Sequence, residues 1–229
     1  MINMQNISAG GYLSASFLDW EGHVAAVIFM SGCNFKCPWC HNSDLVFNKT
    51  TPIKVTEIIE DIKRRKLFLD GVVISGGEPT CSLGLISMIR EMKKIGLPIK
   101  LDTNGSHPEV LKRLLDEKLV EFIAMDVKSP LNDQDLMRMT GVSISSDLLK
   151  ESIELIKRLA LNYEFRTTYT PELLSQEELL KIRKELNDDV HWVVQCFKPV
   201  NCIDDNCLNY KEVKSEDIKK ILPGIKIRG

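Results

Sequence analysis

The sequence predicts an α/β fold built on a parallel sheet. Short apolar runs that are typical of buried strands alternate with segments of helical periodicity about six times along the 229 residues. Such alternation indicates successive strand–helix units joined by right-handed crossovers. A full eight-unit barrel takes around 250 residues, so six units with a short additional strand fit this length better. The alternation by itself does not exclude an open, doubly wound sheet.

The first buried strand is expected at residues 24–30. This run is continuous, apolar and bounded by Gly22 and Gly32. Residues 10–20 before it alternate loosely between apolar and polar side chains, which predicts a small strand or hairpin. After it, apolar residues at helical spacing predict a first helix near 54–66.

Further strands and helices follow in alternation. Pro108 suits the first turn of a helix, and Ser175 with Glu178 forms the pattern of a capping box. The expected strands lie near 72–74, 99–101, 122–125, 164–169 and 191–197; the expected helices lie near 85–92, after 108, and at 146–159, 175–186 and 216–222.

Length and composition predict one globular domain over residues 1–229, with a core at about 24–198, the hairpin at 10–20 and a C-terminal extension at 199–229. Hydrophobic residues make up 44% and charged residues 27% of the chain. A net charge of −2 gives no electrostatic reason to expect nucleic-acid binding. No apolar stretch has the length of a membrane span, and no signal pattern is visible, so we expect a cytoplasmic protein whose seven cysteines are metal ligands or free thiols.

Three cysteines lie close together directly after the first predicted strand. Cys33, Cys37 and Cys40 are separated by three and two residues, and such a loop can wrap one soft metal centre. Closed structural zinc sites take four protein ligands, and no fourth is evident here. A [4Fe–4S] cluster usually has four cysteine ligands, so three would leave one iron with the open position that catalysis needs. The alternative is a zinc knuckle completed by a distant cysteine.

Polar motifs also end three other predicted strands. They are Gly76-Gly77-Glu78-Pro79, Asp102-Thr103-Asn104-Gly105 and Asp126-Val127-Lys128. Because parallel strands share one carboxyl face, we expect these motifs to lie near the cysteine loop. Paired glycines let a backbone approach a ligand closely, and a carboxylate accepts hydrogen bonds from an ammonium group. Simple turns and solvated charges are the alternatives.

Two further polar residues fall within predicted inner strands, where an unpaired polar side chain would be costly. Arg166 and Gln195 therefore either line a cofactor or substrate cavity or pair with a neighbouring carboxylate. Cys196, Cys202 and Cys207 follow late in the chain without the spacing of a second cluster. Free thiols are favoured for these three over a metal or disulfide role.

The motifs together resemble those of a known family. The Cys-x3-Cys-x2-Cys loop, with Trp39 just before its last cysteine, is similar to the signature of radical S-adenosylmethionine (radical SAM) enzymes. Residues 76–79 match the Gly-Gly-Glu-Pro motif of that family. The ending Cys40-His41-Asn42 resembles that of activases of glycyl radical enzymes, and residues 102–105 and 126–128 resemble segments of pyruvate formate-lyase activating enzyme. The resemblance spans about 24–198.

The resemblance implies a partial (β/α)6 barrel with two cofactors. A [4Fe–4S] cluster would be bound by the three cysteines, and S-adenosylmethionine would chelate its open iron. The family's motifs imply that residues 76–79 hold the methionyl amino group and that Lys128 faces the cofactor's carboxylate. Polar contacts to a ribose or a cation would come from Asp102 and Asp126; Trp39, Asn104, Arg166 and Gln195 complete the expected cofactor site.

The implied reaction is reductive cleavage of S-adenosylmethionine to methionine and a 5′-deoxyadenosyl radical. The resemblance is strongest to activating proteins of anaerobic ribonucleoside-triphosphate reductase and pyruvate formate-lyase. It implies a glycyl radical enzyme as protein partner and a low-potential electron donor such as flavodoxin or ferredoxin. In that case we expect residues 201–214 to order themselves against the partner.

Two alternatives remain open at this point. The first is a radical SAM enzyme acting on a small molecule, such as a deazapurine synthase. The second is a non-catalytic iron–sulfur carrier or a zinc-binding adaptor. The sequence of residues 76–79 argues against the second, because a carrier has no need of a cofactor cradle.

Overall fold

A computed structural model describes residues 4–229 and contains one mostly parallel sheet. Its eight strands lie in the order β10-β9-β8-β7-β6-β5-β3-β2. Only β2 runs antiparallel, against β3. The strands are β2 (Gly11–Ser16), β3 (Ala25–Met30), β5 (Gly71–Gly76), β6 (Ile99–Thr103), β7 (Phe122–Asp126), β8 (Asn162–Tyr169), β9 (Trp192–Cys196) and β10 (Lys226–Arg228).

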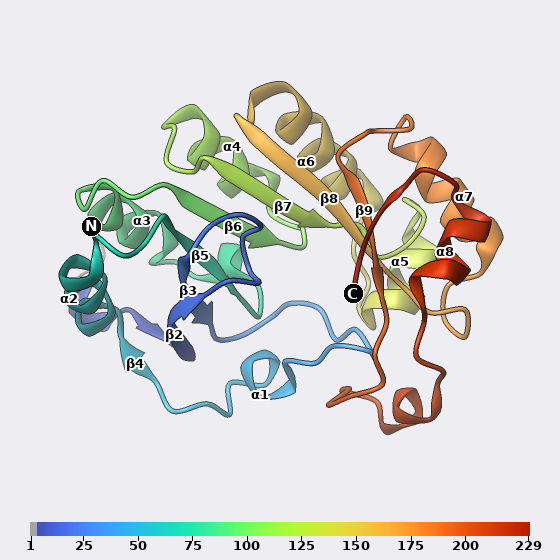
Figure 1. Ribbon diagram of the computed structural model, residues 1–229, viewed down its shortest axis with the longest axis horizontal. Helices are drawn as coiled ribbons and strands as arrows, with labels where there is room; N and C mark the ends of the chain where they lie inside the picture. Colours follow the sequence, from blue (N-terminus) through green and yellow to red (C-terminus); the bar gives the residue numbers. More distant parts are fainter. Residues whose placement is uncertain (1–3) are drawn as a thin grey trace.

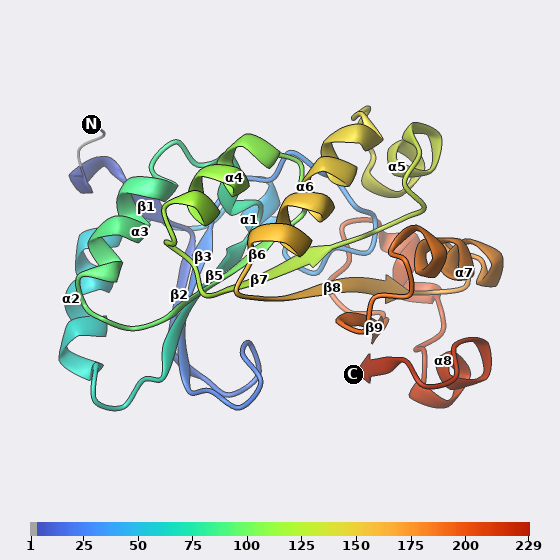
Figure 2. The ribbon, with the colours of Figure 1, turned by 90° about the horizontal axis from the view of Figure 1, so that it is seen from above.

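The crossovers carry the helices along the outer face of the sheet. Figure 2 shows α3, α4 and α6 side by side over this face. The helices are α1 (Ser43–Val46), α2 (Val55–Arg65), α3 (Leu85–Lys93), α4 (Pro108–Asp116), α5 (Asp133–Thr140), α6 (Ser146–Leu159), α7 (Gln176–Glu185) and α8 (Ser215–Ile221). Since the described strands end in two separate edges, β2 and β10, the sheet forms a partial barrel, as predicted (Figure 1).

The small strand or hairpin predicted at 10–20 is present as β2, which pairs antiparallel with β3. Other elements were not predicted. A separate two-stranded sheet joins β1 (Ser8–Ala9) to β4 (Ile53–Lys54). The short α5 and β10 have too few apolar positions to show a periodicity in the sequence. β10 forms by pairing with the otherwise unpaired edge of β9.

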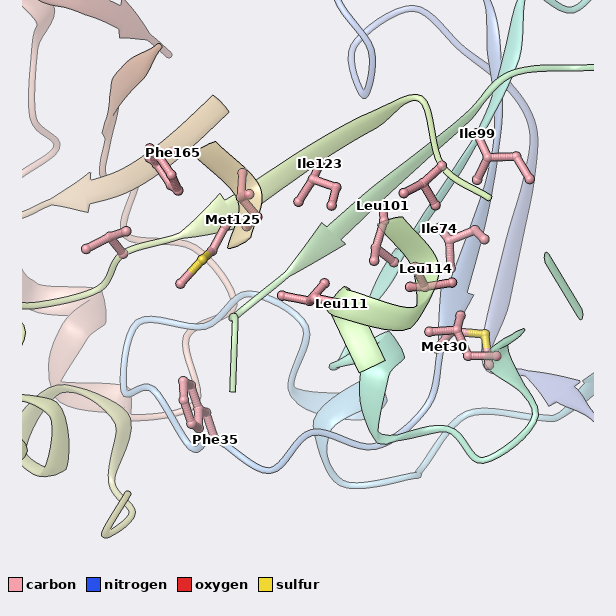
Figure 3. Close-up of a cluster of buried hydrophobic side chains, with 14 of the residues drawn as sticks. Met30, Phe35, Ile74, Ile99, Leu101, Leu111, Leu114, Ile123, Met125 and Phe165 are labelled. Atoms are coloured by element: carbon pink, nitrogen blue, oxygen red, sulfur yellow. The ribbon is translucent and has the colours of Figure 1, made fainter. Parts of the chain in front are cut away.

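The main core lies between the sheet and its helices. Alternate residues of β3, such as Ile28 and Met30, face the helices. The whole strand is apolar because it is buried on both faces. Figure 3 shows Leu111 and Leu114 of α4 packed toward Leu101 of β6. Each fully buried side chain of this kind contributes about 1.5–3 kcal/mol relative to exposure.

The inner face of the sheet carries a small apolar cluster toward its N-terminal end, beside the buried side chains of Lys100 and Glu164. Trp20 packs there with Ala25, Val27 and Val73 and closes that end of the barrel. A β-carbon at Gly71 would come within 2.6 Å of the Trp20 ring, so this position has room only for glycine. Farther along the strands, inward-facing side chains become polar, which leaves the carboxyl end of the barrel for chemistry.

Among the described residues, no helix has the length and apolarity needed to span a membrane.

Candidate active site

A cavity of about 230 Å³ opens at the carboxyl ends of the parallel strands. It brings together all the residues predicted to form the site except Pro79 and Gln195. Gln195 lies beside Thr168 on the next strand and is partly buried, whereas Pro79 begins a short 3-10 helix. The predicted residues that line the cavity are Cys33, Cys37, Trp39, Cys40, Gly76, Gly77, Glu78, Asp102, Asn104, Asp126, Lys128 and Arg166.

Several lining residues were missing from the prediction. Ser75 and Thr168 follow Val73 and Arg166 by two positions and therefore share their inward face. That period of two is a signal in the sequence that could have identified both. Phe35, which also lines the cavity, lies between two cluster cysteines and had no such signal.

The cysteine loop is held from both sides by backbone hydrogen bonds. The Lys36 N–H donates to the Thr140 carbonyl at the end of α5, at 2.7 Å. From the other side, the N–H groups of Ile203 and Asp204 donate to the carbonyls of Cys40 and Pro38, at 3.1 and 2.9 Å. The prediction that residues 201–214 become ordered against a partner protein is therefore wrong for residues 203 and 204, because these two residues already pack on the loop.

Burial raises the pKa of two of the cysteine thiols in this loop. The Cys37 side chain is only 5% exposed, and burial raises the pKa of its thiol to about 12. Burial also raises the pKa of Cys33. A buried thiolate without a metal would be costly, while a bound metal centre stabilises it. This donor set therefore fits a soft metal centre.

The number of cysteines also fits a cluster. A [4Fe–4S] cluster usually has four cysteine ligands, so three leave one iron open. Only three cysteines line the cavity, as a cluster with one open iron requires.

The two glycines at the end of β5, Gly76 within the strand and Gly77 after it, are required by the cysteine loop itself. Gly76 has a φ of +112°, and a β-carbon on it would overlap the backbone of Met30. A β-carbon on Gly77 would overlap the carbonyl oxygen of Gly32. The Gly77 and Glu78 N–H groups donate to the carbonyls of Met30 and Gly32, each at 2.8 Å. The glycines thus let the end of β5 pack directly against the start of the cysteine loop.

Glu78 lies at the centre of a buried hydrogen-bond network. Its side chain is 1% exposed, and Oε1 accepts hydrogen bonds from the hydroxyls of Thr80 and Thr103 at 2.5 and 2.7 Å. Oε2 accepts from the Asn104 N–H at 2.6 Å. Burial raises the pKa of this carboxyl, although these donors oppose the shift. Glu78 thus joins the ends of β5 and β6, a role that the sequence did not indicate.

The Asn104 side chain extends this network to the cysteine loop. Its amide donates to the Asn34 side-chain oxygen at 2.9 Å, and the Asn34 amide donates to the Ser106 hydroxyl at 2.9 Å. Asn34 lies between Cys33 and Cys37. The cysteine loop is therefore connected through side chains to β6 as well as through backbone to β5.

Charged side chains form a chain across the cavity floor. The Arg166 guanidinium contacts Asp126 at 2.8 Å and Asp102 at 3.3 Å, and the Lys128 ammonium contacts Asp126 at 3.1 Å. Burial opposes the charge on Asp126, but Arg166 and Lys128 outweigh it and lower its pKa to about 2. The same pairing raises the pKa of Lys128 despite its burial. Both carboxylates already have protein cations as partners.

One oxygen in this chain lacks a donor. Asp102 Oδ1 is buried and has no hydrogen-bond partner among the described residues, although the Lys100 ammonium lies 3.3 Å away. Asp102 lines the cavity, so a hydroxyl or ammonium group bound there would satisfy this acceptor. The polar groups present thus fit a zwitterionic, ribose-containing cofactor beside a cluster.

The fold and the site define a class of protein: a partial barrel whose carboxyl face combines three cysteines with a polar cavity. The sequence pattern of the radical SAM superfamily matches residues 27–182, and the chain belongs to that superfamily. Its members use a [4Fe–4S] cluster and S-adenosylmethionine.

Two relatives indicate where in the superfamily the chain lies. A "putative glycyl-radical enzyme activating enzyme" of Methanocaldococcus jannaschii is 35% identical over 92% of this chain and 88% of its own length. The pyruvate formate-lyase-activating enzyme of Staphylococcus aureus is 29% identical over half of each protein.

Solved structures share the fold. Streptococcus suis SuiB bound to its precursor peptide SuiA matches 89% of this chain with a TM-score of 0.67 at 14% identity. SuiB bound to S-adenosylmethionine matches 88% with the same TM-score. This chain covers 48% and 49% of those chains, so it spans about half their length.

Proposed function

We propose that this protein is an activase that places a radical on a backbone glycine of a partner glycyl radical enzyme. The observation that carries the proposal is the similarity to an activating enzyme over nearly the whole of both chains. The Cys40-His41-Asn42 ending of the cysteine loop, with His41 and Asn42 on the cavity wall, supports it further. The proposed location is the cytoplasm, where cysteines serve as metal ligands or free thiols, and none of the seven cysteines is in a disulfide.

In this proposal each part of the site has a separate task. Cys33, Cys37 and Cys40 bind the cluster, and Lys128 attracts the cofactor's carboxylate. Arg166 holds Asp102 in place, so that its free oxygen can accept from the cofactor. When bound, the cluster supplies the electron that cleaves S-adenosylmethionine.

The framework around these residues is already assembled. Glu78 and the two glycines fix the loop ends, so little reorganisation is needed on binding. Phe35 and Trp39 supply the apolar part of the wall, which keeps water from the reacting centre.

The lining of the cavity is the reason to propose a macromolecular target over a small molecule. Most of the lining residues are those assigned here to the cluster and to S-adenosylmethionine. A second substrate would therefore approach from outside the cavity, as a glycine on a flexible peptide loop can do.

The test combines the reduced, cluster-loaded protein with S-adenosylmethionine and a candidate glycyl radical enzyme in the absence of oxygen. We expect a glycine-centred doublet in the EPR spectrum of the partner. The Cys37→Ala variant serves as control and should give no signal. No doublet with any glycyl radical enzyme of the source genome, together with turnover of a purine-like compound, would favour the small-molecule alternative. A flavodoxin- or ferredoxin-type donor is the proposed source of the electron.

A further inference from the structure

Two cysteines outside the cavity lie against one another in the C-terminal extension. The Cys202 thiol donates to the Val200 carbonyl at 3.7 Å, and the side chains of Cys202, Cys207 and Tyr210 lie close enough to shift one another's pKa. Cys207 is fully buried and Cys202 is 9% exposed. The pairing is a product of local folding, because a short 3-10 helix over Asp205–Asn209 turns the chain back on itself.

These cysteines bracket the residues that hold the cysteine loop. We call residues 202–207 the strap. Within it, the Ile203 and Asp204 N–H groups donate to the carbonyls of Cys40 and Pro38. Any cross-link between residues 202 and 207 would therefore enclose both anchoring donors in one small ring.

The two thiols differ in their access to solvent. Cys202 and Asn201 line a polar cavity of about 430 Å³, whose other wall is formed by residues 41–45. A small solute in this cavity can reach Cys202, whereas Cys207 lies behind it. One partly accessible thiol backed by a second is the arrangement used in stepwise disulfide exchange; burial raises the pKa of both thiols, so the exchange should quicken as the pH rises.

We propose that Cys202 and Cys207 form a dithiol–disulfide pair that locks the strap against the cysteine loop under oxidising conditions. The oxidant is a low-molecular-weight disulfide. The Cys202 thiolate attacks one of its sulfurs, forming a mixed disulfide and releasing one thiolate. The Cys207 thiolate then attacks the Cys202 sulfur, forming the intrachain bond and releasing the second thiolate. The two protons lost by the cysteines pass to the two released thiolates, and the small disulfide is reduced.

The bond is tested on the cluster-loaded protein without oxygen, so that Cys33, Cys37 and Cys40 stay ligated. The protein is incubated with oxidised glutathione, and its free thiols are then alkylated. Digestion with a protease that cleaves before aspartate separates Cys202 from Cys207, because Asp204 and Asp205 lie between them. Cys196 shares the fragment of Cys202, so mass-spectrometric sequencing of the joined fragments identifies which of the two is linked. We expect the two fragments to remain joined until a reductant is added. Cys81, on another part of the surface, should be alkylated throughout.

The effect on the strap is measured as iron release to a chelator before and after oxidation. Oxidation should slow iron loss several-fold in the wild type, because the ring restrains the strap. It should not do so in Cys202→Ala or Cys207→Ala, and Cys196→Ser, at a cysteine that lines neither cavity, should behave as the wild type. Using both strap variants keeps the test valid if the buried Cys207 position tolerates no change. Free alkylation of both strap thiols, a link from Cys202 to any other cysteine, or equal iron loss before and after oxidation would overturn the proposal.

Discussion

Glu78 at the end of β5 accepts a hydrogen bond of 2.6 Å from the backbone N–H of Asn104 at the end of β6. This contact joins two loops that are 26 residues apart in the sequence, inside the rim of the cavity. Because Asn104 in turn contacts Asn34, the same carboxylate is two hydrogen bonds from the cysteine loop. Glu78 is therefore a structural centre of the site as well as a candidate cofactor ligand.

Replacement of Glu78 by alanine should weaken S-adenosylmethionine binding and also lower stability. The cofactor contact would account for roughly 1.5–3 kcal/mol of binding free energy, and each buried donor left without a partner costs about 1–3 kcal/mol. Titration of the cluster-loaded protein with S-adenosylmethionine and anaerobic urea unfolding measure the two effects. Glu109→Ala, on the exposed face of α4, is the matched control. Unchanged affinity would show that Glu78 has no role in cofactor binding.

Gly77→Ala should displace the cysteine loop. The new β-carbon would overlap the Gly32 carbonyl, which also accepts the Glu78 N–H bond, so the backbone must move. We expect reduced iron content after anaerobic reconstitution, measured by iron and sulfide analysis. Gly11→Ala is a suitable control, because its β-carbon would lie 3.4 Å from Phe29, at ordinary contact distance. Full iron content in Gly77→Ala would contradict the close packing described here.

Anaerobic reconstitution should load about four irons and four sulfides per chain, as one [4Fe–4S] cluster contains. Simultaneous replacement of Cys33, Cys37 and Cys40 by alanine should abolish this cluster. Under reducing conditions Cys202→Ala and Cys207→Ala should retain it, since neither cysteine lines the main cavity. Stoichiometric zinc without iron uptake in anaerobically purified protein would instead indicate a zinc site.

Arg166→Met should destabilise the protein by about 3 kcal/mol, because it leaves Asp102 and Asp126 without their shared cation. This value is at the lower end of the usual stability loss for a broken buried ion pair, because the Asp126 side chain is 29% exposed. Anaerobic denaturant unfolding at pH 7 measures the loss. A loss below about 1 kcal/mol, as for a surface ion pair, would contradict the buried network.

The acid dependence of stability should weaken in the same variant. In the wild type the pKa of Asp126 is lowered to about 2 from its ordinary 3.8. Its contribution is therefore complete above about pH 5 and is lost as the pH falls through 4 toward 2. Without Arg166, the Lys128 ammonium alone opposes burial, so the pKa of Asp126 is lowered less and the variant should lose less stability than the wild type as the pH falls from 5 toward 2. Parallel curves for the two proteins would exclude this coupling.

The sequence alone determined the parallel α/β fold and most of the cavity. Strand and helix periodicities are local, and parallel strands all end on one face, so motifs at strand ends had to meet there. For this reason the three cysteines, Gly76, Lys128 and Arg166 could be placed together without coordinates. The identity of the superfamily follows from the same short motifs.

Only the tertiary structure determined which polar groups contact one another. The sequence indicated Glu78 as a ligand, but only folding shows that Asn104 and Thr103 occupy its oxygens. Likewise the contact of Ile203 with Cys40 joins residues 163 positions apart, and no local pattern carries such a pairing. Periodicity reports which side of an element is buried; the partner of a buried polar group depends on the register and packing of distant segments, which only the folded chain fixes.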